Sequence, residues 1–171
     1  PGAQAAVAAA PQGPIAVIAT EGTVKGGAYV RAIQALAPDM PVAQQAAPLF
    51  VALAEEGLTE GPITELVAAR YLTPLLATLP RPKALVLGCT HFPVLKRTIA
   101  AVAGADVALV DSAEATARAV EKILREQRLL NPGPVQPPVF LATDAPGRFA
   151  HIGRIFLGEA IDPGAVTLID L

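Results

Sequence analysis

The clearest structural signal in the chain is the stretch Lys83-Ala-Leu-Val-Leu-Gly-Cys-Thr-His-Phe-Pro93. Its first half is continuously apolar, which is typical of a short strand buried on both faces, as strands of parallel sheets are. Its second half turns polar, and Pro93 suits the first position of a helix. The stretch therefore predicts a buried strand over residues 83–88, a polar turn at 89–92 and a helix from Pro93.

The same alternation of short apolar runs and longer amphipathic runs extends along the chain. Further strands are predicted at residues 14–19, 42–46, 105–110, 139–142 and 166–169. Helices are predicted at residues 24–36, 48–56, 62–79, 111–128 and 148–157. The expected core positions are Ala28, Ile33 and Leu36 in the first of these helices, and Leu66, Val67, Tyr71 and Leu75 in the third. Asp111, with Glu114 three residues later, is typical of a capped helix start, and the four prolines of residues 129–138 predict a loop.

This order of elements indicates an α/β fold, a doubly wound parallel sheet with helices on both faces. In such sheets, ligands bind beyond the carboxyl ends of the strands. We therefore expect chemistry at residues 20–23, near Ala46, at residues 89–92 and at residues 111–112.

Composition argues against several classes of partner. The 171 residues are 53% hydrophobic, carry a formal charge of −2 and include 4% aromatic residues and no Trp. Without clustered Lys and Arg, a surface for nucleic acid or an anionic membrane is not expected, and no apolar run approaches the roughly 18 residues of a membrane span. The alanine-rich run at residues 5–10 lacks the positive flank of a signal peptide. We expect a cytoplasmic protein, and a small anionic or zwitterionic ligand is compatible with this composition, because one or two local groups are enough to hold it.

Cys89 is the strongest candidate for chemistry. A lone cysteine is most often an inert apolar residue of a core. Cys89, however, follows a strand and precedes an expected helix N-terminus, a position that favours the thiolate. His91 supplies a polar or cationic neighbour, and Thr90 offers a hydroxyl beside backbone donors that could bind a carboxylate. The single cysteine excludes an internal disulfide and a multi-cysteine metal site, and His91 and His151 show no ligand spacing, so no metal is expected.

The stretch Ala84-Leu-Val-Leu-Gly-Cys-Thr-His-Phe-Pro-Val-Leu95 resembles the second cysteine motif of glutamate racemases, members of the aspartate/glutamate racemase superfamily. Residues 18–29, 48–57 and 139–144, with Arg148-Phe149, resemble other parts of the same family in the same order. The resemblance implies that residues 1–110 form a nearly complete flavodoxin-like racemase domain carrying Cys89. It implies that residues 111–171 are part of a second, similar domain whose N-terminal portion is absent.

The resemblance also implies a reaction. Glutamate racemases interconvert L- and D-glutamate without a cofactor, by two cysteine bases on opposite faces of the α-carbon, and so supply D-glutamate for peptidoglycan. Cys89 would be one base, Thr90 and His91 would bind substrate or assist proton transfer, and Glu55 would be a nearby auxiliary carboxylate. A homodimer is among the assemblies that the resemblance allows.

Family members also carry an earlier Asp-Ser pair and a first catalytic cysteine in a Cys-Asn-Thr motif, which these 171 residues lack. We therefore expect the chain to represent the C-terminal two-thirds of such a protein and to be inactive alone. Three alternatives stay open: a racemase of aspartate or hydantoins, a cysteine hydrolase using Cys89 and His91, and a non-catalytic fragment. His91 favours glutamate over aspartate, and no carboxylate that could orient His91 for hydrolysis is evident near it in the sequence. From its residue type and position alone, Glu55 is a solvated helix end.

Overall fold

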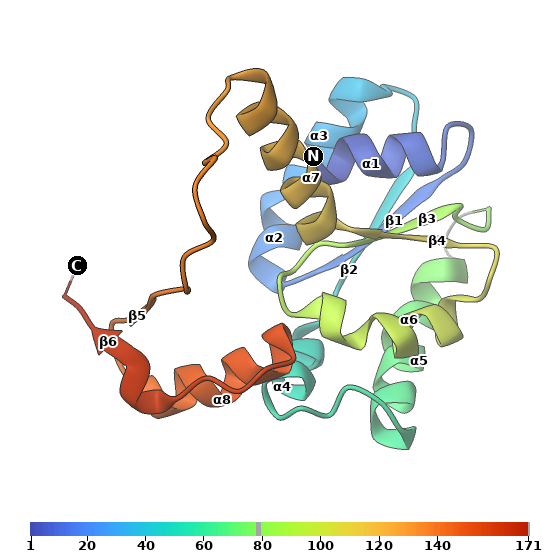
Figure 1. Cartoon of the computed structure of the whole chain (residues 1–171). Coiled ribbons are helices and arrows are strands. Elements are labelled where there is room, and N and C mark those ends of the chain that lie inside the picture. The colour runs from blue at the N-terminus through green and yellow to red at the C-terminus, as the bar shows by residue number, and fades with distance from the viewer. Residues whose placement is uncertain (78–79, 171) are drawn as a thin grey trace.

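Four parallel strands form the main sheet of the computed structural model, which describes residues 1–77 and 80–170 (Figure 1). They are β1 (Ile15–Ala19), β2 (Val42–Ala46), β3 (Ala84–Leu87) and β4 (Ala108–Asp111). Their order in the sheet is β2-β1-β3-β4, and every neighbouring pair is parallel. This is the strand order of flavodoxin-like folds, so the predicted doubly wound α/β class is confirmed.

The two faces of this sheet bury alternate residues of the same strands. Ile15, Val17 and Ala19 of β1 pack with α1 (Gly2–Ala9) and α3 (Ala28–Leu36), on one face. Ala16 and Ile18 pack on the other face with α4 (Pro48–Glu55), α5 (Pro62–Ala77) and α6 (Lys96–Ala103). Figure 1 shows α1 and α3 above the sheet and α5 and α6 below it. β1 and β3 are buried at every residue, because helices cover both of their faces.

Two helices stand where one was expected at residues 24–36, and the first of them starts before residue 24. α2 (Glu21–Gly26) begins after Thr20, whose side chain accepts a hydrogen bond from the Thr23 N–H group. Gly27, with φ of 61°, takes the left-handed conformation that ends α2, and α3 follows. Because of this break, Ile33 is the one expected core residue that α3 buries, and Ala28 and Leu36 are exposed.

The buried stripe of α5 also differs from the expected one. Thr64, Ala68, Leu72 and Leu75 are buried, whereas Leu66 is 72% exposed. Val67 and Tyr71 are half-buried beside this stripe. Thr64 is buried because its hydroxyl donates to the Leu58 carbonyl 2.9 Å away, a contact that hydrophobic periodicity does not reveal. The expected end of this helix, at residues 78–79, lies outside the described residues.

The segment after β3 starts with a 3₁₀ helix instead of the expected α-helix from Pro93. η1 (Phe92–Leu95) comes first, and α6 begins only at Lys96. The strand expected at 105–110 is β4, shifted to 108–111. Asp111 caps α7 (Ser112–Glu126) by accepting hydrogen bonds from the N–H groups of Ala113 and Glu114. The Glu114 carboxylate pairs with Lys96 and Arg118, so only the Asp111 half of the expected cap forms.

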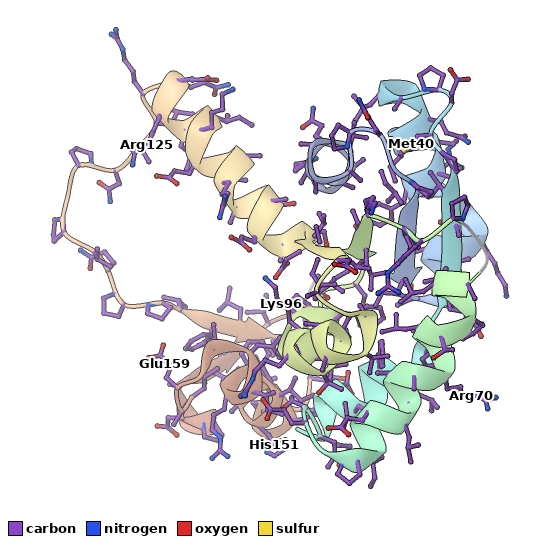
Figure 2. The ribbon with its side chains drawn as sticks, turned by 90° about the vertical axis from the view of Figure 1, so that its right-hand side faces the viewer. Met40, Arg70, Lys96, Arg125, His151 and Glu159 are labelled. Atoms are coloured by element: carbon purple, nitrogen blue, oxygen red, sulfur yellow. The ribbon has the colours of Figure 1, made fainter. Side chains whose placement is uncertain are left out.

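The C-terminal part of the chain forms a second, small sheet. β5 (Phe140–Ala142), α8 (Pro146–Leu157), η2 (Pro163–Ala165) and β6 (Val166–Leu168) make up what we call the C-terminal unit. β5 and β6 pair with each other in parallel. An extended segment over residues 128–139 joins this unit to α7, which buries none of its residues (Figure 1). Figure 2 shows Arg125 near the far end of α7, in the upper part of the view, and His151 on α8 in the lower part. Among the described residues, no helix is long and apolar enough to cross a membrane.

Candidate active site

The carboxyl ends of all four strands of the main sheet meet at one edge, where the sequence predicted chemistry. Strand register places Ala19 beside Ala46, and Leu87 beside Asp111. Cys89 lies two residues beyond the end of β3, a central strand of this sheet. The turn that carries Cys89 is tied down on one side by Ser112, whose hydroxyl donates to the Leu87 carbonyl at 2.7 Å.

Gly88 brings the Cys89 turn against the neighbouring strand. Its N–H group donates to the Ile18 carbonyl at 2.8 Å. A methyl group on Gly88 would lie 2.9 Å from the Tyr29 ring, closer than a side-chain carbon approaches, and 3.0 Å from the Ile18 carbonyl oxygen, a tight contact with backbone. Close packing therefore favours glycine at this position, immediately before Cys89.

The turn places His91 against the Cys89 thiol. The Cys89 Sγ atom and the His91 Nδ1 atom are 3.8 Å apart, a weak hydrogen-bond distance for sulfur. Phe92, the next residue, is fully buried and packs edge-to-face on Phe50 of α4 at 5.3 Å between ring centroids. This anchor holds the backbone of the turn, so the proximity of thiol and imidazole is built into the core packing.

Glu55, the last residue of α4, reaches the other nitrogen of the same imidazole. Its Oε1 atom lies 3.2 Å from His91 Nε2. An ionised carboxylate only accepts hydrogen bonds, so His91 donates from Nε2 in this contact. When His91 is neutral, its Nδ1 then carries a lone pair that faces the Cys89 sulfur. Thiol, imidazole and carboxylate thus form a continuous proton-handling chain.

Arg148 of α8 completes this chain from the C-terminal unit. Its Nη2 atom donates to Glu55 Oε2 at 2.6 Å. The hydrogen bond from Arg148 holds the pKa of Glu55 below its ordinary value; partial desolvation opposes this effect, and His91 adds to it. From the same helix, the Phe156 ring packs edge-on against the His91 ring, with 5.5 Å between centroids.

The predicted site residues are thus partly brought together. Cys89 contacts His91, and His91 contacts Glu55, while Thr90 is exposed to solvent beside them. Sequence reasoning missed Arg148 and Phe156 as site residues. Arg148 pairs with a residue 93 positions away, and no local pattern signals such a contact.

Two arguments from the sequence need correction at this point. First, no α-helix starts directly after Cys89, because η1 intervenes and α6 begins at Lys96. His91 and a single 3₁₀ turn are therefore what the structure offers to a thiolate. Second, a carboxylate does orient His91, namely Glu55, so its expected absence does not count against a hydrolase.

A metal centre has no candidate ligands in the part of the chain that the structure describes. Over residues 1–77 and 80–170, no three His, Cys, Asp or Glu side chains gather as metal ligands would.

Residues 1–120 match the family described as Asp/Glu/hydantoin racemase. The chain belongs to this family. A glutamate racemase of Syntrophus aciditrophicus is 46% identical to it over 164 residues, which cover 95% of this chain and 60% of that relative. A glutamate racemase of Geobacter metallireducens is 45% identical over 159 residues, or 92% of this chain and 58% of that relative. The chain thus spans about 60% of the length of the curated relatives that it matches.

Solved structures of the family agree with the fold of this racemase-family chain. The glutamate racemase of Francisella tularensis superposes with a TM-score of 0.85 at 32% identity, covering 99% of this chain and 62% of that one. The glutamate racemase of Thermus thermophilus gives a TM-score of 0.80 at 39% identity, covering 98% and 60%. The resemblance stated from the Cys89 motif is therefore confirmed.

Proposed function

We propose that this chain is the part of a cofactor-independent glutamate racemase that carries one of two catalytic bases, Cys89. The observation that carries the proposal is the Cys89–His91–Glu55 chain at the carboxyl end of a central strand. The relatives support the substrate, since those named above are glutamate racemases and the Francisella tularensis enzyme was solved with D-glutamate.

The proposed chemistry is a proton transfer across the α-carbon. Inversion requires one group to remove the α-proton from one face and another to deliver a proton to the opposite face. A Cys89 thiolate would take the proton and become a thiol, while a second acid protonates the carbanion from behind. In the reverse direction the Cys89 thiol would donate. Because Cys89 is the only cysteine in the sequence, a second cysteine base would come from the part of the relatives' length that these residues do not span.

The other site residues receive roles consistent with their positions. His91 would exchange a proton with the Cys89 sulfur through Nδ1, and Glu55 would stabilise the imidazolium that results. Thr90, exposed at the same edge, would bind a substrate carboxylate. The enzyme would act in the cytoplasm, and the D-glutamate that it makes would be used to build peptidoglycan. A homodimer is a candidate assembly.

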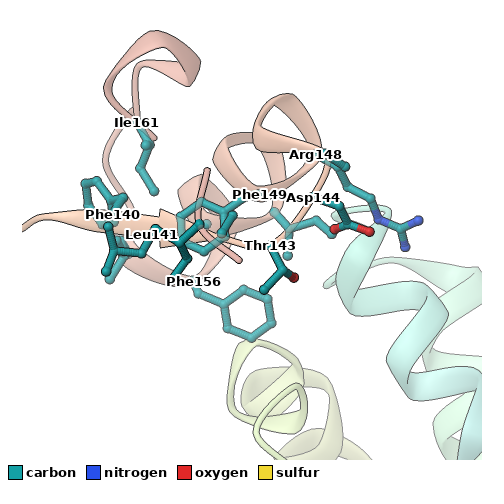
Figure 3. Close-up of a pocket in the computed structure, with 14 residues that line it drawn as sticks. Phe140, Leu141, Thr143, Asp144, Arg148, Phe149, Phe156 and Ile161 are labelled. Carbon is teal, nitrogen blue, oxygen red and sulfur yellow. The ribbon is translucent and has the colours of Figure 1, made fainter. Parts of the chain in front are cut away.

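We also propose that residues 1–110 form the racemase domain that carries Cys89, and that residues 111–171 belong to a second domain. An open apolar hollow in the C-terminal unit supports this division. It has a volume of about 670 Å³ and is lined by Phe140, Leu141, Phe149, Phe156 and Ile161 among others (Figure 3). An apolar hollow of this size on a two-stranded sheet is typical of a surface that further chain covers.

Two other functions use the same residues. The family includes aspartate and hydantoin racemases by its description, and a hydrolase could use Cys89, His91 and Glu55 as nucleophile, base and orienting group. A hydrolase would form a thioester with an acyl substrate, whereas a racemase only exchanges the α-proton. Substrate-derived mass on Cys89 therefore separates the two classes of reaction.

The direct test joins this chain to the part of the Syntrophus aciditrophicus relative that the match does not cover, which we propose lies on its N-terminal side. The chimera should convert L- to D-glutamate, and in D₂O the product should carry deuterium at the α-carbon. Cys89→Ala should abolish conversion, and Cys89→Ser should reduce it by orders of magnitude because the hydroxyl is a much weaker acid.

Matched controls decide the outcome. Aspartate and a hydantoin, offered at the same concentration, should be turned over far more slowly than glutamate. Undiminished racemisation by the Cys89→Ala chimera would refute the role of Cys89, and a preference for aspartate would replace the substrate.

A further inference from the structure

Arg148 and Glu55 both lie at helix ends that disfavour their charges. Arg148 is the third residue of α8, close to the positive N-terminal end of the helix dipole. Glu55 is the last residue of α4, at the negative C-terminal end. Neither placement stabilises its own helix, so local helix stability does not explain why the two charges meet.

The Arg148–Glu55 contact controls the geometry of one particular carboxylate. Arg148 holds Oε2 at 2.6 Å, and this leaves Oε1 directed at His91 Nε2 at 3.2 Å. The Glu55 side chain is 26% exposed, so water competes for both oxygens. Without Arg148, a glutamate at a helix end would sample several rotamers, and its contact with His91 would be intermittent.

The same helix makes a second, independent contact with His91. Phe156 packs edge-on against the imidazole ring at 5.5 Å. Figure 3 shows Arg148 directed toward the helix that carries Glu55, and the Phe156 side chain extending in a different direction. α8 thus contacts both members of this pair: Phe156 packs on the His91 imidazole, and Arg148 binds the Glu55 carboxylate.

We propose that Arg148 is a positioning residue of the Cys89 site. By holding Oε2 of Glu55 it keeps Oε1 on His91 Nε2, which fixes the proton of neutral His91 on Nε2 and leaves the Nδ1 lone pair facing the Cys89 sulfur. Arg148 acts through Glu55 and His91, and among the described residues its side chain forms no hydrogen bond with the Cys89 thiol. This inference rests on the proposed function for its catalytic meaning, whereas the proton position on His91 can be measured without any turnover.

The test compares four versions of the 171-residue chain: wild type, Arg148→Ala, Arg148→Lys and Arg154→Ala. Arg154 is the matched control, because it lies on α8 and forms no ion pair with the described residues. Lysine is expected to substitute for Arg148, since a single nitrogen, Nη2, makes the recorded contact. ¹⁵N NMR of the His91 ring reports which nitrogen carries the proton, and the pH profile of Cys89 alkylation by iodoacetamide reports the thiolate.

Wild type, Arg148→Lys and Arg154→Ala should show His91 mainly protonated on Nε2. Arg148→Ala should show a mixture of the two tautomers and a rate of Cys89 alkylation at pH 7 about two- to fivefold lower, the range of one exposed charge contact. Equal spectra and rates for Arg148→Ala and Arg154→Ala would overturn the proposal, as would a loss that Arg148→Lys does not restore. Failure of the chimera to racemise glutamate would leave these readouts unchanged, so the two proposals can fail separately.

Discussion

At the scale of single residues, the site is a row of four side chains in which each holds the next. Cys89 and His91 come from one turn, Glu55 from α4 and Arg148 from α8. The first two are two residues apart, so the sequence could predict their proximity from the strand-to-turn pattern. Glu55 was expected near them only through the family resemblance, because it is 36 residues from His91.

The Glu55 carboxyl group should titrate below its ordinary value of about 4.5, and the hydrogen bond from Arg148 is the largest cause. In a ¹³C NMR titration, the Glu55 midpoint should rise toward 4.5 in Arg148→Ala. Since the pKa is lowered in the folded chain, the stabilisation is fully present above about pH 4.5 and is lost as pH falls through the lowered value. The gap in free energy of unfolding between wild type and Arg148→Ala should shrink in the same range. An unchanged Glu55 midpoint in Arg148→Ala would contradict the pairing.

At the scale of elements, the strands were easier to predict than the helix starts. β1 and β3 are buried on both faces, so their sequences are continuously apolar and unambiguous. Helix starts depend on particular side-chain contacts, such as the Thr20 cap that begins α2 three residues before the expected start. A 3₁₀ turn such as η1 uses the same residues as the start of an α-helix, so periodicity cannot separate them.

The two sheets should differ in stability. β3 has a hydrogen-bonded partner on each side, whereas β5 and β6 pair only with each other among the described residues. A two-stranded sheet is marginal in water, so its amides should open more often. Hydrogen exchange should be at least about tenfold faster at Leu141 than at Leu85. Equal protection at low protein concentration would show that the small sheet is as stable as the main one.

At the scale of the whole molecule, the sequence predicted the doubly wound sheet but not how the C-terminal unit meets it. The predicted strands 139–142 and 166–169 pair with each other as β5 and β6, a pairing that the order of elements did not predict. The placement of this unit on α4 depends on contacts such as Arg148 with Glu55, 93 residues apart. Contacts between such distant residues carry no periodic signal in a single sequence.

The 171-residue chain by itself should not racemise glutamate. One cysteine can act on one face of the α-carbon only, and no second cysteine exists in the sequence. Chiral chromatography of L-glutamate after prolonged incubation should show no D-glutamate above the no-protein control. Turnover by a purified monomeric sample, lost on Cys89→Ala, would show that a second base of another residue type completes the site.

The exposed segment 128–139 makes the seating of the C-terminal unit an intramolecular binding reaction. This tether contains about a dozen residues and four prolines, and chains of that kind span on the order of 20–40 Å. A linker of this length keeps the C-terminal unit at an effective concentration of order millimolar near α4. An association too weak to join two separate molecules would therefore suffice to keep Arg148 in contact with Glu55. Added salt screens exposed charges, so it should lower the fraction of molecules in which the C-terminal unit is docked on α4. Because the docking is intramolecular, this fraction should not depend on protein concentration.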